Sequence, residues 1–172
     1  MENQSHEINE VLDSIAESIT QLEDLMNSID ENKINTIPYE GSWTAPKLIT
    51  HVKKSINLMS RVMQMEAKPA DRDPGERIAE LKKTFLNFTN KFNAPELIIP
   101  EDGIYERQLT IDKLNEAFQG FKENARDANL NEIVDGQSLG PITKLEIIHF
   151  TLFHTMRHLH QMEKICEALK SK

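Results

Sequence analysis

The chain has 172 residues, of which 38% are hydrophobic and 28% charged, with a net charge of -8. This length and composition suit one soluble globular domain, expected over residues 1–172, and exclude a disordered chain. No apolar run approaches the roughly 18 residues of a membrane span, no secretory signal pattern begins the sequence, and the acidic charge argues against nucleic acid as a partner. With a single cysteine, Cys166, we expect a cytoplasmic protein without disulfides or a membrane partner.

The first half of the chain predicts three helical segments. Apolar residues recur every three or four positions, which places them on one face of a helix. Thr44 with Pro46 and Asp73 with Pro74 are typical of helix starts. The expected helices are 5–29, 44–66 and 74–92, with a loop over 30–43.

The second half predicts two further helices, over 110–128 and from 143 to about 170. Thr110 is a candidate N-cap of the first, and Thr143 with Glu146 forms a capping-box pattern for the second. No segment shows sustained alternation of the strand kind. The sequence therefore predicts an all-α fold, a four-helix bundle with an extra helical segment.

The charge is uneven along this predicted bundle. Residues 1–31 hold nine acidic residues and no Lys or Arg, whereas residues 47–91 hold ten basic and five acidic residues. Two solvated helix faces account for this pattern. The alternative is that the basic segment faces the acidic first helix, across the bundle or across a subunit contact.

The last helix is rich in histidine. His154 and His158 stand four residues apart within its apolar arc, so that their rings can converge on one atom, as in known transition-metal sites. Two ligands bind a metal loosely, and His51, at the edge of the apolar face of the second helix, is the candidate third. The alternative is that these are core histidines with hydrogen-bond partners. A three-histidine site would leave a coordination position open, as catalytic metals require.

Two motifs carry a resemblance to a known family. The segment from Gly41 through Trp43 to His51 resembles the W-[ST]-x-x-x-[LIV]-x-x-H motif of the DinB-like (DinB/YfiT-like) superfamily. Leu139-Gly-Pro-Ile-Thr, followed by His154-Thr-Met-Arg-His-Leu-His-Gln161, resembles its C-terminal signature. Residues 67–109 match neither motif.

The resemblance implies a four-helix bundle, often a homodimer, with a divalent metal such as nickel or zinc on three histidines. Carried over by residue, these are His51, His154 and His158. Some relatives are thiol-dependent S-transferases, in which the metal activates a small thiol toward an electrophilic small molecule. The expectation is a metal-dependent transferase or hydrolase, and the alternative is a non-catalytic or stress-related bundle that acts through dimerisation.

Five neighbouring residues have more modest predicted roles. Gln161 lies one turn beyond His158 and is a candidate to orient a ligand or cofactor. Arg157 is predicted to be a surface charge, and Glu146 to cap its helix. Cys166 lies on the core stripe and is predicted to be a buried, inert thiol. Trp43 is expected to pack on the bundle end, with lining of a substrate pocket as the alternative.

Overall fold

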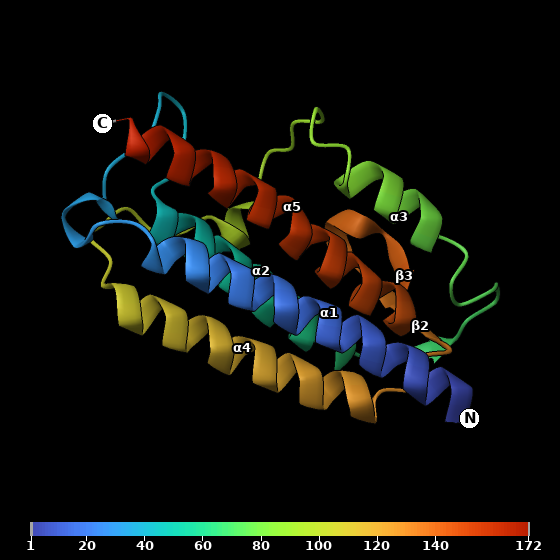
Figure 1. Cartoon of the computed structure of the whole chain (residues 1–172). Coiled ribbons are helices and arrows are strands. Elements are labelled where there is room, and N and C mark those ends of the chain that lie inside the picture. Colours follow the sequence, from blue (N-terminus) through green and yellow to red (C-terminus); the bar gives the residue numbers. More distant parts are fainter. Residues whose placement is uncertain (1, 172) are drawn as a thin grey trace.

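Four long helices form the body of this computed structural model, which describes residues 2–171 (Figure 1). They are α1 (Glu2–Asn27), α2 (Ala45–Met63), α4 (Arg107–Asp127) and α5 (Lys144–Lys170). α2 packs mainly on α4 and α5, and α1 packs mainly on α5. Buried aliphatic side chains from all four helices form the core, among them Leu12, Leu48, Leu114 and Ile147. The predicted all-α four-helix bundle is confirmed.

The additional helix, α3 (Ile78–Phe85), packs against the outside of α5 (Figure 1). The helix predicted over 74–92 is therefore too long at both ends. Before α3, the Asp73 carboxylate accepts a hydrogen bond from the backbone N–H two residues later. After it, Asn87 Oδ1 accepts from the backbone N–H and hydroxyl of Thr89. Such local side-chain bonds favour turns over helix. The helical spacing of the phenylalanines in this segment therefore predicts a longer helix than the chain forms.

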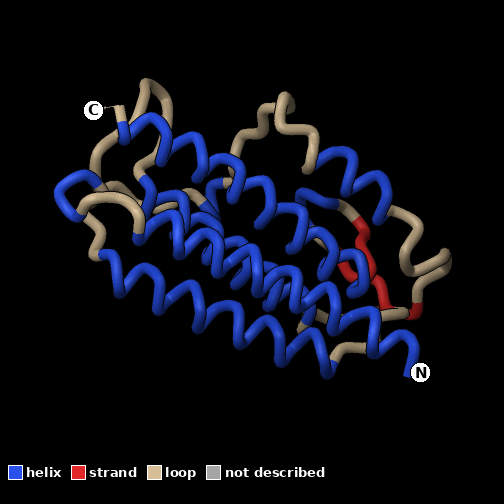
Figure 2. Tube along the Cα trace, in the orientation of Figure 1, coloured by secondary structure: helices blue, strands red, loops and turns tan. Residues whose placement is uncertain are grey.

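Three short strands form an antiparallel sheet at one end of the bundle (Figure 2). They are β1 (Lys68–Pro69), β2 (Glu132–Asp135) and β3 (Pro141–Thr143), in the order β1-β2-β3. The prediction of no strands is wrong, because segments of two to four residues are too short to show alternation. The sheet joins the α2–α3 connection to the α4–α5 connection.

The remaining boundaries agree with the prediction to within a few residues, and three 3-10 turns lie in the connections. These turns are η1 (Glu31–Lys33), η2 (Glu96–Ile98) and η3 (Gln137–Leu139). Thr110 is not an N-cap: it lies inside α4, where its hydroxyl donates to the Glu106 carbonyl oxygen. Among the described residues, no helix has the length and apolar character needed to cross a membrane.

The basic segment does not face α1 across the bundle. Among the described side chains, its ion pairs are with Glu80, Glu101, Asp102 and Glu146, and none is with an acid of residues 1–31. Glu31 pairs instead with Arg107 of α4. Pairing across the bundle is therefore wrong for these side chains, and pairing across a subunit contact stays a prediction.

Candidate metal centre

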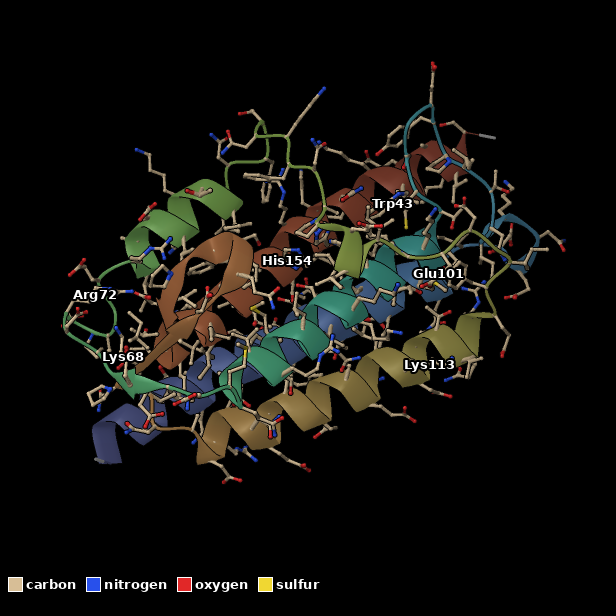
Figure 3. The ribbon with its side chains drawn as sticks, turned by 180° about the vertical axis from the view of Figure 1, so that it is seen from behind. Trp43, Lys68, Arg72, Glu101, Lys113 and His154 are labelled. Carbon is tan, nitrogen blue, oxygen red and sulfur yellow. The ribbon has the colours of Figure 1, made fainter. Side chains whose placement is uncertain are left out.

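Three histidines from two helices meet in the interior beside α3. His51 comes from the second turn of α2, which begins after Thr44 and has Pro46 in its first turn. His154 and His158 come from successive turns of α5. All three are buried, with 3%, 7% and 8% of their surfaces exposed. The three histidines predicted to share a site thus do come together, and Figure 3 shows where His154 lies along α5.

The geometry of the three rings suits a single ion. One ring nitrogen from each residue lies within 4.8 Å of the other two. His154 Nε2 and His158 Nε2 are 3.1 Å apart, and the centroid of the His51 ring lies 4.6 Å from that of His158. Nitrogens about 2.0–2.1 Å from a common ion have separations of this order. The donor set and spacing therefore fit a transition metal.

Hydrogen bonds on the opposite ring nitrogens turn the rings toward one another. His51 Nδ1 donates to the Ile98 carbonyl oxygen at 2.9 Å, and His158 Nδ1 donates to Gln161 Oε1 at 3.0 Å. A carbonyl oxygen only accepts, so each bond fixes the proton on Nδ1 and leaves the lone pair on Nε2. The role of Ile98 was not foreseen, because a main-chain carbonyl has no signature in a sequence.

Burial keeps the three imidazoles neutral. It lowers the pKa of His51 below the ordinary value, against the hydrogen bond to Ile98, and it lowers the pKa of His154 further. It lowers the pKa of His158 to about 3, because protonated His158 would also repel the protonated form of His51, and the bond to Gln161 opposes this shift. A metal ligand must be the neutral base, so the site presents its nitrogens in the binding form at neutral pH.

A large pocket opens beside the histidines. Its volume is about 1330 Å³, and its lining includes His51, His154 and His158. Trp43 also lines it, with its ring centroid 5.0 Å from that of His51, while packing against the core. The tryptophan therefore packs against the core and also lines the pocket, and its contact with a substrate stays a prediction. The pocket gives a small molecule access to the three imidazoles.

The prediction that Arg157 is a surface charge is wrong. Its guanidinium is half-buried and donates to the carbonyl oxygens of Phe85, Asn87 and Asn90. It also lies 4.7 Å from the centroid of the Phe92 ring. The helical phase placed it away from the core correctly, but the segment after α3 folds over that face. Arg157 therefore ties this segment to the helix that carries His154 and His158.

Glu146 caps α5 as predicted, and it also has a partner that the sequence did not reveal. The carboxylate is fully buried and accepts two hydrogen bonds from Arg72, at 2.6 and 2.7 Å, and others from the backbone N–H groups of Thr143 and Arg77. Burial alone would raise the pKa of Glu146, but the guanidinium and the N–H groups lower it. No spacing rule could have found Arg72, because it lies 74 residues away.

Cys166 lies near the C-terminal end of α5 and does not line the pocket beside the histidines. It is buried, as predicted, and its thiol donates weakly to the Leu25 carbonyl oxygen at 3.5 Å. Burial raises the pKa of this thiol above its ordinary value. Its bond with Ser28 and the charge of Lys170 act in the opposite direction but do not outweigh burial, so the thiol stays protonated and is a poor nucleophile.

Comparison with solved structures supports the fold. One solved structure, described as the crystal structure of TT2238, a four-helix bundle protein, superposes with a TM-score of 0.62. The match covers 91% of this chain and 98% of that one at 16% sequence identity, so it bears on the fold alone. No curated protein matches the chain.

Comparison with protein families identifies the group to which the chain belongs. The sequence profile of the DinB superfamily matches residues 14–162. That range includes α2 and most of α5, and with them all three histidines of the cluster. The chain is a member of the DinB superfamily.

Proposed function

We propose that this protein is a divalent-metal-dependent enzyme that joins a low-molecular-weight thiol to an electrophilic small molecule. His51, His154 and His158 would hold the metal, and nickel and zinc are among the ions that imidazole ligands suit. One observation carries the proposal: three buried, neutral imidazoles converge beside a pocket large enough for substrates. Family membership supports it.

The side chains of the site have distinct tasks. The Ile98 carbonyl and Gln161 hold the rings of His51 and His158 in register, so we assign Gln161 to orientation of the ligand set. A bound divalent ion favours the deprotonated form of a thiol near neutral pH. The thiolate sulfur then forms a bond to the electrophilic carbon, the leaving group departs with its electron pair, and the thiol proton passes to solvent.

The open side of the site supports catalysis over a closed structural site. Structural zinc sites are closed by four protein ligands, whereas three ligands leave room for a substrate. Within the described residues, the group able to hold an ion consists of these three histidines alone. The remaining coordination position would face the pocket, where both substrates would be held.

Metal binding is the first test. We expect elemental analysis of freshly purified protein to find about one nickel or zinc ion per chain, and the H154A/H158A variant to lose it while keeping its helical circular dichroism. The matched control is H149A/H160A, which removes two histidines from the same helix and should retain the metal. Wild-type protein that purifies without metal and does not bind added nickel or zinc would contradict the proposal.

The second test separates catalysis from a structural role. The metal-loaded enzyme should consume a thiol such as cysteine together with 1-chloro-2,4-dinitrobenzene, which releases chloride, and H154A/H158A should not. The alternative is a non-catalytic, stress-related bundle that acts as a homodimer. It predicts a metal that raises the melting temperature, a dimer in light scattering, and no binding of thiols. Turnover of an activated ester without a thiol would favour a hydrolase instead.

A further inference from the structure

We infer that the pocket beside the histidines binds an amphipathic organic anion. Its apolar body would lie on the wall formed by residues 85–99, and its carboxylate or sulfonate would face Lys91 and Lys164. The inference rests on the proposed function only in assigning this molecule the role of the electrophile. Its binding does not require the metal and can be measured without it.

The wall exposes an unusual amount of apolar surface. Phe88, Phe92, Leu97 and Ile99 all line the pocket and remain 42%, 49%, 66% and 43% exposed. Scattered apolar residues on a surface need no explanation, but four exposed apolar side chains that line one pocket indicate a binding site. An apolar group placed here would remove these side chains from water, which favours binding by the hydrophobic effect.

This exposed wall is held in place by specific contacts. Arg157 fixes the backbone through three carbonyl oxygens and lies over the Phe92 ring. Phe92 stacks on Phe85 with ring centroids 5.3 Å apart, and Phe88 stacks on His160 at 4.1 Å. A wall ordered before the ligand arrives costs the ligand less conformational entropy on binding. Such ordering of solvent-exposed rings indicates a surface shaped for a ligand.

The charges around the pocket favour an anion. Four cationic side chains and two carboxylates line it, in a chain whose net charge is -8. Both arginines donate to backbone carbonyl oxygens, and Glu80 lies 3.7 Å from Arg77. Lys91 and Lys164 form no hydrogen bond or ion pair with any described residue, and Glu40 is the one lining carboxylate without an ion pair among the described residues. Glu163 does not line the pocket and pairs with His160. Two uncommitted ammonium groups beside an apolar wall complement a carboxylate attached to an apolar body.

The test compares two probes with the same apolar body, 4-phenylbutyrate and 4-phenylbutanol, on full-length protein treated with a chelator. Trp43 lines the pocket and is the single tryptophan of the chain, so its fluorescence reports binding. At low salt we expect the anion to bind about fivefold more tightly than the alcohol, and 0.5 M salt to reduce the preference. The K91M/K164M variant should bind both probes equally. The F88A/F92A variant should weaken both.

The matched control is K82M/K83M. Lys82 and Lys83 are exposed on α3 and do not line the pocket, so their replacement changes the net charge equally but should keep the preference. Equal affinity of wild-type protein for the two probes, or no binding of either, would overturn the inference. So would an equal effect of the two lysine pairs. Because these titrations are metal-free, their failure is distinct from the absence of bound metal, which would refute the proposed function.

Discussion

Replacing Arg72 with methionine removes the charged partner of Glu146 while keeping much of the aliphatic volume of the arginine. The Glu146 carboxylate would keep its two backbone N–H donors, from Thr143 and Arg77, but would lose both guanidinium bonds. Arg72 lies at the sheet end of the bundle (Figure 3), and Glu146 lies in the first turn of α5. The variant therefore tests what holds the start of the helix that carries His154 and His158.

The expected loss follows from burial. Breaking a buried ion pair from one side costs about 3–5 kcal/mol, because the remaining charge stays desolvated. Here the Arg72 side chain is 18% exposed, so water can enter part of the vacated space, and two donors remain on the carboxylate. We therefore expect the free energy of unfolding to fall by about 3 kcal/mol, which at this chain length lowers the melting temperature by roughly 6–12 °C.

Urea unfolding followed by circular dichroism measures this loss, and its pH dependence identifies the cause. In the wild type the lowered pKa of Glu146 contributes stability that is present above 4.5, the ordinary value, and is lost as the pH falls through the folded value. Without Arg72, burial raises that pKa, so protonation relieves the penalty. The deficit of the variant should be largest near pH 7 and should shrink toward pH 4.

The matched control is Asp102→Asn, which breaks an ion pair with Lys47. The Asp102 side chain is 97% exposed, so we expect a change of less than about 1 kcal/mol. A loss for Arg72→Met as small as that of the control, or a deficit of the same size at every pH, would refute the account. The second outcome would mean that Arg72 stabilises the protein through packing alone.

The other predictions concern the metal site and the buried thiol. The Gln161→Leu variant should weaken nickel or zinc binding by about 10- to 100-fold in competition with a chromophoric chelator, whereas exposed Gln119→Leu should not, because Gln161 orients the His158 ring. Metal-free protein should lose stability as the pH falls from 6.5 toward 3, because His158 takes up a proton in the unfolded state but not in the folded state. The free energy of unfolding measured in urea should drop by about 1.4 kcal/mol per pH unit for each such imidazole, and a flat profile would contradict this. Cys166 should react with Ellman's reagent in 8 M urea but only very slowly in the native state, and rapid native labelling would disprove its burial.

The long helices and the three clustered histidines were predictable because their signals are local. The apolar spacing along α1, α2, α4 and α5 is long enough to define a helix, and the four-residue interval between His154 and His158 places both rings on one face. His51 was found because its helical phase points inward and because its segment resembles a family motif. Those signals are all contained within short stretches of sequence.

The features that the sequence missed depend on contacts between distant segments. The strands last only two to four residues, so they exist through pairing and not through an alternating pattern. Arg157 faces away from the bundle core. It is half-buried only because the chain after α3 folds over it and accepts its hydrogen bonds. The prediction that Glu146 caps α5 is correct, but its partner Arg72 is brought to it only by the tertiary fold.

The histidines and the wall opposite them lie on different kinds of structure. The imidazoles belong to long helices of the core, whereas the face opposite them belongs to the irregular connection over residues 86–106, held at a few points such as Arg157 and the Ile98 carbonyl. Irregular connections tolerate substitution and changes of length better than packed helices do. Substitutions within residues 86–106 therefore change the shape of the pocket while the three histidines keep their places on the core helices.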